Sequence, residues 1–196
     1  MSKEVWIWSD PHFGHENCYT KFKNYDGTPM RPWNNMQEAE EYMIQEYNKL
    51  VHEGDTCYWL GDICGIQTYA EKIMPRFNKS RRILVLGNHD AKLGAKYWLK
   101  WFNNIRGDFN RENHIFSHFP VCSGSKGRFK RNVHGHTHGN FITINNNGKI
   151  KDVWYKNVSV EAIKFRPINF SEILEETEKL IEKGLIIIPK KGDSIV

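Results

Sequence analysis

Short clusters of histidine, aspartate and asparagine end or interrupt apolar segments at five places in this 196-residue chain. The clusters are DPH at 10–12, GD at 61–62, GNHD at 87–90, SH at 117–118 and GHTH at 135–138. Imidazole together with carboxylate and amide oxygen suits divalent ions such as Mn²⁺, Fe²⁺, Zn²⁺ and Ni²⁺. No CxxC pair is present to build a cysteine-rich structural zinc site. The clusters therefore predict a catalytic metal centre.

The spacing within the clusters favours shared ligation. Residues two apart on an extended strand point to the same side, so Asp10 with His12, and His136 with His138, can each face one metal. Asp62 is a lone carboxylate, but its two oxygens can bridge two ions about 3.5–4 Å apart. We therefore expect two ligand pairs joined by one bridging carboxylate.

Alternating strands and helices must position these side chains. Apolar, β-branched runs that end in metal-capable residues predict three strands, over residues 4–9, 56–63 and 81–90. Amphipathic spacing predicts helices over 35–51 and 67–78, and Pro75 should bend or end the second helix. This alternation favours a largely parallel sheet, in which functional sites collect at the carboxyl ends of the strands.

The second half of the chain predicts mostly β-structure. Apolar segments predict four further strands, over 114–120, 132–139, 141–144 and 158–165. One helix is expected over 94–103, and NNNG at 145–148 predicts a turn. Residues 18–35, which contain Gly27, Pro29 and Pro32, predict a long loop.

The C-terminal part predicts a helix and an edge strand. The helix is expected over 171–183, with Ser171 as its N-cap and without the Glu or Gln of a full capping box. The tail over 184–196 contains one apolar run that could add an edge strand. No repeat or linker divides the chain, so a single domain over residues 1–196 is expected.

The five clusters, in this order, resemble the pattern DxH, GDxx[DG], GNH[DE], H and GHxH of the calcineurin-like metallophosphoesterase family. DPH, GDICG, GNHD, SH and GHTH keep every block and span about two-thirds of the chain. The short length, the GHEN extension and the ending VSVEAIKFRPINFSEI also look like small members without a cap domain from bacteria and their phages. The resemblance implies an α/β (α+β) fold, a four-layer αββα sandwich of two mixed β-sheets flanked by helices.

The resemblance also implies roles for individual residues. The implied ligands of the first metal ion are Asp10, His12 and His138, and those of the second are Asn88, His118 and His136. Asp62 would bridge the two divalent ions, for which Mn²⁺ is the first expectation and Fe²⁺, Zn²⁺ or Ni²⁺ the alternatives. His89 would protonate the leaving oxygen after attack by a bridging hydroxide, and Asp90 would orient the His89 imidazole.

Substrate contacts are predicted from residues near these blocks. His15 and Asn17 in GHEN either contact substrate or cap a local turn, and Asn88 is a candidate for substrate contact as well as for ligation. The basic run at 124–131, which includes Arg128, either clamps a phosphate or nucleic-acid backbone or forms a solvated loop.

A few further residues carry expectations of their own. Arg31 beside Trp33 would suit a nucleobase by charge and stacking, unless Trp33 anchors its loop. His114 is assigned to structure or surface. Cys57, within TCYWL, is expected in the core.

These patterns predict a metal-dependent phosphoester hydrolase. Its expected substrate is a small phosphodiester or phosphomonoester such as a nucleotide or cyclic nucleotide. The net charge of +5 keeps open a nuclease that acts on short or single-stranded nucleic acid. A non-catalytic metal-binding scaffold is the alternative from another class, and the retention of all seven implied ligands and His89 argues against it.

Hydropathy and cysteine content bear on where in the cell the protein is expected. No apolar stretch is long enough to span a membrane, and the N-terminus has no signal-peptide pattern. The four cysteines lack the density of a disulfide scaffold, so reduced thiols are expected. We therefore expect a cytoplasmic protein without membrane contact, in the host cytoplasm if phage-encoded, and its oligomeric state stays open.

Overall fold

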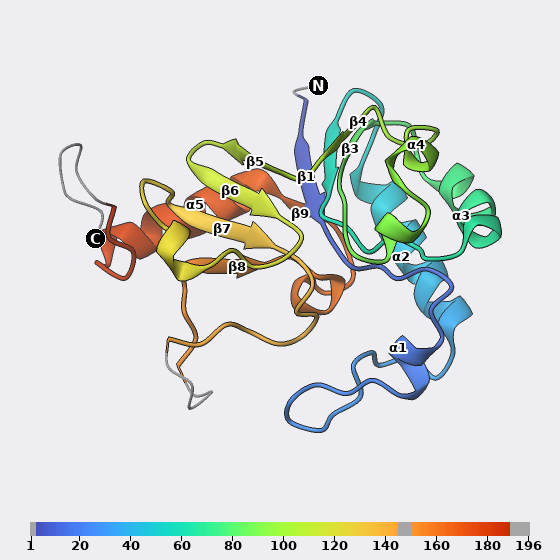
Figure 1. The fold of residues 1–196 in the computed structure, drawn as a ribbon, viewed down its shortest axis with the longest axis horizontal. Helices are drawn as coiled ribbons and strands as arrows, with labels where there is room; N and C mark the ends of the chain where they lie inside the picture. Colours follow the sequence, from blue (N-terminus) through green and yellow to red (C-terminus); the bar gives the residue numbers. More distant parts are fainter. Residues whose placement is uncertain (1–2, 145–149, 189–196) are drawn as a thin grey trace.

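The computed structural model describes residues 3–144 and 150–188, within which two β-sheets pack beside each other (Figure 1). The first sheet has the strand order β4-β3-β2-β1-β9. Its strands are β1 (Val5–Trp8), β2 (Thr56–Trp59), β3 (Arg81–Val85), β4 (Asn104–Arg106) and β9 (Ile168–Asn169). Neighbouring strands from β1 to β4 are parallel, and β9 is antiparallel to β1.

The second sheet has the order β5-β6-β7-β8. Its strands are β5 (Asp108–Arg111), β6 (His114–Ser117), β7 (Arg131–His134) and β8 (Tyr155–Asn157). β5 and β6 are antiparallel, whereas β6, β7 and β8 are parallel. Both sheets are therefore mixed, as predicted.

Helices flank the two sheets. The α-helices are α1 (Asn17–Thr20), α2 (Met36–Leu50), α3 (Gln67–Ile73), α4 (Ala95–Trp98) and α5 (Phe170–Glu182), and the 3₁₀ helices are η1 (Met74–Arg76), η2 (Asp90–Lys92), η3 (Ser123–Ser125) and η4 (Val160–Ile163). Figure 1 shows α2, α3 and α4 beside the first sheet and α5 along the second. Across the residues described, none of these helices has the length and apolar character needed to cross a bilayer.

Alternating side chains of β2 join the layers. Trp59 packs against Trp8 of β1, with ring centroids 4.5 Å apart, and against Tyr47 of α2 at 5.4 Å. Tyr58, the preceding residue, faces the other way and stacks on Phe109 of β5 at 4.7 Å. Because successive side chains of a strand point to opposite faces, one strand contacts both the helical layer and the second sheet. The sandwich of two mixed sheets with flanking helices is confirmed.

The predicted strands and helices of the first half are confirmed, with shorter strands. The runs 56–63 and 81–90 form strands only as far as Trp59 and Val85, because their last residues turn into the site described below. Pro75 ends α3 as predicted, since it lies at the start of η1. The predicted loop 18–35 contains no strand or helix beyond the end of α1.

Two predicted strands are wrong. Residues 158–165 contain the 3₁₀ helix η4 (Val160–Ile163) instead of a strand, although the alternation of Val158 and Val160 resembles one. These valines are fully buried, so their alternation reflects burial within a turn rather than a pleat. Residues 141–144 form only an isolated bridge from Thr143 to Lys151.

Short elements escaped prediction. β4 and β9 contain three and two residues, which is too few for a pattern to repeat, and β5, DFNR, contains one apolar residue. The predicted helix over 94–103 reduces to α4. Residues 184–188 form no strand, while the rest of the predicted edge strand and the NNNG turn lie outside the described residues.

The start of α5 corrects the expected cap. Asn169 is the N-cap, and its side chain accepts a hydrogen bond from the Ser171 backbone N–H at 2.9 Å. The Glu172 side chain accepts one from the Asn169 N–H at 3.2 Å, which completes a capping box. The helix therefore begins one residue earlier than expected, and the acidic partner is present.

The cysteines and the buried His114 follow the sequence interpretation. All four cysteines are free thiols, and Cys57 is fully buried. His114 is also fully buried, with Nδ1 2.8 Å from the Glu112 carbonyl and Nε2 3.1 Å from Thr177 Oγ1 of α5. It therefore links the second sheet to α5.

Candidate metal centre

The polar clusters meet where strands of both sheets end. Asp10 and His12 follow β1, Asp62 follows β2, Asn88 follows β3, His118 follows β6, and His136 and His138 follow β7. In Figure 1 the arrowheads of β6 and β7 point toward the first sheet. The loops that leave the second sheet therefore reach the carboxyl ends of β1 and β2.

Three groups of potential ligand atoms form there, each with all its atoms within 4.8 Å of one another, and the third, His12, His15 and His89, shares His12 with the first. The first group contains Asp10, His12 and His138, and the second contains Asp62, His118 and His136. Asp62 lies between them, because its Oδ2 is 3.5 Å from His12 Nε2 and its Oδ1 is 3.5 Å from His118 Nε2. Each oxygen of one carboxylate thus faces a different group.

His118 is oriented by a backbone carbonyl. Its Nδ1 lies 2.7 Å from the Leu60 carbonyl oxygen, which leaves Nε2 to face Asp62 and, at 3.2 Å, Asn88 Oδ1. Metal-binding histidines commonly donate their second ring N–H in this way. Burial lowers the pKa of His118, but Asp62 and Asp10 outweigh burial and raise it to about 9. A metal ion would have to displace that proton.

His138 is oriented by a buried carboxylate that the sequence interpretation missed. Its Nδ1 lies 3.2 Å from Glu161 Oε1, which also accepts a hydrogen bond at 2.8 Å from Nε of Arg31. The same guanidinium donates to the carbonyl oxygens of Asp10 and Pro11, each at 2.8 Å. In the first group, Arg31 therefore fixes the backbone at Asp10, and Glu161 orients the His138 ring. A lone acid within the apolar segment VSVEAIKF was the available signal.

Arg31 and Trp33 do not form the predicted nucleobase site. Arg31 is only 1% exposed, and its donors bind protein acceptors. Trp33 packs edge-on against Phe165, with ring centroids 4.6 Å apart, and against Tyr42 at 5.4 Å. The loop-anchoring alternative applies to Trp33 because its ring is occupied by these contacts.

Unpaired polar atoms test whether a cation fits the first group. Asp10 Oδ1 and His12 Nε2 are both buried without a hydrogen-bond partner and lie 3.8 Å apart. Burying such atoms unpaired is costly, and a divalent cation would satisfy both. Burial raises the pKa of the Asp10 carboxyl and lowers that of the His12 imidazole. The donor set therefore fits a divalent metal ion.

Backbone strain concentrates at the same residues. Among the described residues, five of the predicted ligands have left-handed φ values between 50° and 67°, namely Asp10, His12, Asp62, His136 and His138. Non-glycine residues in this region commonly mark functional sites, at a cost of about 1–3 kcal/mol each. The surrounding structure must stabilise these turns against that cost.

Two glycines permit the close approach of the carboxylates. A Cβ on Gly87 would lie 2.2 Å from Asp62 Oδ1, and a Cβ on Gly135 would lie 2.4 Å from Asp10 Oδ2. Any side chain at either position would displace a predicted ligand. This explains why GNHD and GHTH each begin with glycine.

Comparison with known proteins identifies the chain's family. The profile of the calcineurin-like phosphoesterase family matches residues 4–185. The chain belongs to this family. An uncharacterized protein of Methanocaldococcus jannaschii, MJ1445, is 29% identical over 94% of this chain and 95% of its own length.

Two solved structures are similar to this calcineurin-like phosphoesterase. The protein of unknown function AQ665 from Aquifex aeolicus has a TM-score of 0.64 at 21% identity, covering 89% of this chain and all of that one. The nuclease MPE of Pseudomonas putida has a TM-score of 0.44 at 16% identity, covering 75% of this chain and 66% of that one. The similarity to AQ665 shows a shared fold.

His89 and Asp90 have different surroundings in this phosphoesterase. His89 Nε2 lies 4.0 Å from Asp62 Oδ2, and its ring is partly exposed on the open side of the centre. The Asp90 carboxylate instead accepts hydrogen bonds from the backbone N–H groups of Asp62, Ile63 and Gly87, at 2.7, 2.8 and 3.0 Å. Burial raises the pKa of the Asp90 carboxyl to about 7, although these hydrogen bonds act to lower it. Asp90 thus holds the two loops that carry Asp62 and His89.

His15 lies beside the centre, whereas no contact in the described part of the chain ties Asn17 or Arg128 to it, and both stay predictions. The His15 ring centroid is 5.4 Å from that of His12 and 5.2 Å from that of His89. The Asn17 side chain and Arg128 make no hydrogen bond to a predicted ligand within residues 3–144 and 150–188. Lys126 and Lys130, which flank Arg128, pair with Asp152 and Glu178.

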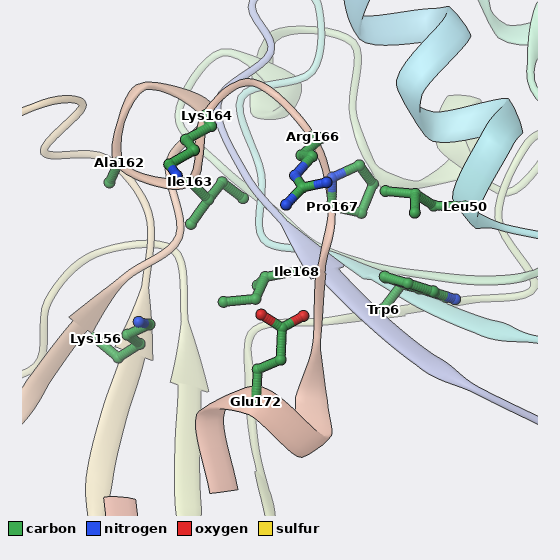
Figure 2. Close-up of a pocket in the computed structure, with 10 residues that line it drawn as sticks. All are labelled: Trp6, Leu50, Lys156, Ala162, Ile163, Lys164, Arg166, Pro167, Ile168 and Glu172. Carbon is green, nitrogen blue, oxygen red and sulfur yellow. The ribbon is translucent and has the colours of Figure 1, made fainter. Parts of the chain in front are cut away.

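A separate cavity of about 270 Å³ lies away from these residues. It is lined by residues of β1, β8 and the 162–168 segment, and Figure 2 shows the charged ends of Arg166 and Glu172 directed toward its space. None of the predicted metal ligands lines it. The predicted metal centre is therefore separate from this cavity.

Proposed function

We propose that this calcineurin-like phosphoesterase hydrolyses a small phosphodiester or phosphomonoester at a dinuclear metal centre. The observation that supports this most directly is Asp62, whose two oxygens each lie 3.5 Å from a histidine of a different ligand group. Two divalent ions, with Mn²⁺ proposed first, would supply Lewis acidity and a water of lowered pKa. The chain's own residues orient the ligands and move the proton.

His89 is the proposed general acid. Its ring is partly exposed and lies edge-on to His12, with centroids 4.6 Å apart, so it borders both the centre and solvent. Its backbone N–H donates to Asp62 Oδ1 at 2.8 Å, which ties its position to the bridging carboxylate. From there, an imidazolium can donate a proton to the leaving oxygen.

The remaining proposed roles concern positioning and substrate contact. Asp90 is a positioning residue, because its carboxylate fixes the backbone on both sides of Asp62. His15 is proposed to contact a substrate phosphate, since its ring adjoins those of His12 and His89 and is only partly buried. Asn88, Asn17 and Arg128 stay predictions as substrate contacts.

Hydrolysis of an aryl phosphodiester tests this function. With Mn²⁺ present, the wild type should release nitrophenol from bis(4-nitrophenyl) phosphate, and His89→Ala should lower kcat about 10²–10⁴-fold for a dinucleotide, whose leaving alkoxide needs the proton. His52→Ala is the matched control, because His52 is exposed and removed from the ligand groups. No turnover of this diester, of the dinucleotide or of 4-nitrophenyl phosphate with any divalent metal would reject the enzyme and favour the scaffold alternative. Unchanged turnover of the dinucleotide in His89→Ala would reject the assigned acid.

A nuclease is the second candidate. Two exposed aromatic rings adjoin the histidines: Phe119 lies with its centroid 4.3 Å from that of His136, and Phe22 lies 5.6 Å from that of His15. Such rings can stack on unpaired bases. Comparing a dinucleotide with longer single strands, and measuring how affinity falls with salt, separates the nuclease from a small-molecule hydrolase.

A further inference from the structure

A cavity beside the metal centre combines exposed aromatic rings with hydrogen-bonding groups. It has a volume of about 460 Å³ and is formed by loop residues Asn24, Tyr25 and Asp26 together with Asn140 and Phe141. The second of these two lining segments begins at Gly139, directly after the predicted ligand His138. We call this cavity the aromatic pocket.

The aromatic pocket is tied to the predicted ligand by hydrogen bonds. Asn157 Nδ2 donates to the carbonyl oxygens of His138 and Asn140, at 2.6 and 2.9 Å. The Tyr25 backbone N–H donates to Asn140 Oδ1 at 3.0 Å, which joins the two walls across 115 positions of sequence. Whatever occupies the pocket is therefore held at a defined place relative to His138.

The lining excludes a phosphate and favours a neutral aromatic group. None of the lining residues is basic, and Asp26 is acidic. Tyr25 is 90% exposed and Phe141 is 45% exposed, so their rings are available for stacking. The Asp26 carboxylate accepts from the backbone N–H and the hydroxyl of Thr28 through Oδ1, at 3.0 and 2.6 Å, which leaves its other oxygen to accept from a ligand. An N–H group of a base, such as the imide N–H of thymine or an exocyclic amino group, is the complementary donor.

We propose that the aromatic pocket binds the nucleobase of the substrate while its phosphoester lies at the metal centre. This inference rests on the proposed function, because the phosphoester places the base next to His138. It assigns the substrate class as nucleoside phosphoesters, either free nucleotides or the end of a single strand. Stacking against aromatic side chains supplies the affinity.

Removing the two rings together tests the proposal. In the Tyr25→Ala/Phe141→Ala variant, kcat/KM for thymidine 5′-(4-nitrophenyl phosphate) should fall about 10- to 100-fold. Methyl 4-nitrophenyl phosphate has the same leaving group and no base, so its kcat/KM should change less than about twofold on the same argument. Leu99→Ala, which removes an exposed apolar side chain of another segment, is the control. Equal losses on both substrates, or no loss on either, would overturn the proposal.

A binding measurement separates this proposal from the proposed function. Metal-free protein should bind thymidine 5′-monophosphate more tightly than ribose 5-phosphate, and the double variant should lose that preference by about 10- to 100-fold. A wild type that shows the preference but hydrolyses nothing would reject the proposed function and keep the pocket. A wild type that hydrolyses both diesters but binds thymidine 5′-monophosphate no more tightly than ribose 5-phosphate would reject the base pocket and keep the proposed function. Tighter binding of a trithymidylate than of the monophosphate would assign the pocket to a strand end, and equal binding to a free nucleotide.

Discussion

Glu161 shows how one buried carboxylate serves two tasks. Its Oε1 accepts from Arg31 and lies 3.2 Å from His138 Nδ1, so it compensates a buried cation and also fixes the tautomer of a predicted ligand. Burial alone would raise the pKa of Glu161, but Arg31 and His138 lower it below its usual value. The carboxylate is therefore charged at neutral pH, as its function toward His138 requires.

Replacing Glu161 should weaken metal binding. We expect Glu161→Gln to lower the affinity for Mn²⁺ about 10- to 100-fold, because the neutral amide removes the negative charge that faces His138 Nδ1 and pairs with Arg31. Calorimetric titration of the metal-free protein measures this, and circular dichroism checks the fold. Glu175→Gln, at an exposed position of α5, is the control. Wild-type affinity in a folded Glu161→Gln variant would contradict the assigned role.

At the scale of elements, the chain enters left-handed backbone conformations directly after β1, β2 and β7, which carry five of the predicted ligands. β7 ends at His134, and His136 and His138 follow in left-handed backbone conformations rather than in the extended one expected for 132–139. The two imidazoles therefore reach different metal groups, instead of one side of one strand as the spacing suggested. Hydrogen bonds between loops, such as the His136 N–H to Asp10 Oδ2 at 2.8 Å, stabilise these turns.

The capping box of α5 makes a prediction at this scale. Asn169→Ala should lower the free energy of unfolding by about 1 kcal/mol, because the first-turn N–H groups lose their acceptor. Ser171→Ala should cost less, since the Ser171 hydroxyl donates to Asn169 and caps no N–H group. Urea unfolding followed by circular dichroism compares the variants. A larger loss in Ser171→Ala would restore the cap expected from the sequence.

At the scale of the whole molecule, His114 couples the second sheet to α5 and makes stability depend on pH. Burial lowers its pKa below the usual value of 6.5, and the Glu112 carbonyl opposes this only in part. Below pH 6.5 the unfolded chain takes up a proton that the folded chain does not, so the free energy of unfolding falls as the pH falls. Above pH 6.5 both states are neutral, and the full stability is present.

Substituting His114 should flatten that dependence. We expect the unfolding free energy of the wild type to fall between pH 6.5 and 5.5 more steeply than that of His114→Gln, by up to about 1.4 kcal/mol per pH unit. Urea titrations in EDTA at pH 7.5, 6.5 and 5.5 measure both slopes. The other titrating groups are common to both proteins and cancel in the difference. Equal slopes would show that His114 is protonated alike in both states.

Local patterns were sufficient for the three central strands of the first sheet. Apolar runs of the right length predicted β1, β2 and β3, and helical spacing predicted α2, because consecutive residues of these strands are buried and α2 buries one face. β4, β5 and β9 were missed because their pairing partners, rather than their own residues, make them strands. The description of the chain as a single domain over 1–196 stays a prediction.

The sequence by itself determined the family and the chemical types at the centre. Five blocks in order carry that information without any geometry, and the family match over residues 4–185 confirms it. The tertiary structure alone decided which side chains support the centre. Arg31 and Glu161 are separated by 130 positions, yet they form a 2.8 Å ion pair beside His138. Tyr25 and Asn140 likewise meet only in the folded chain. Such contacts depend on how loops from different strands converge, and no local spacing encodes that convergence.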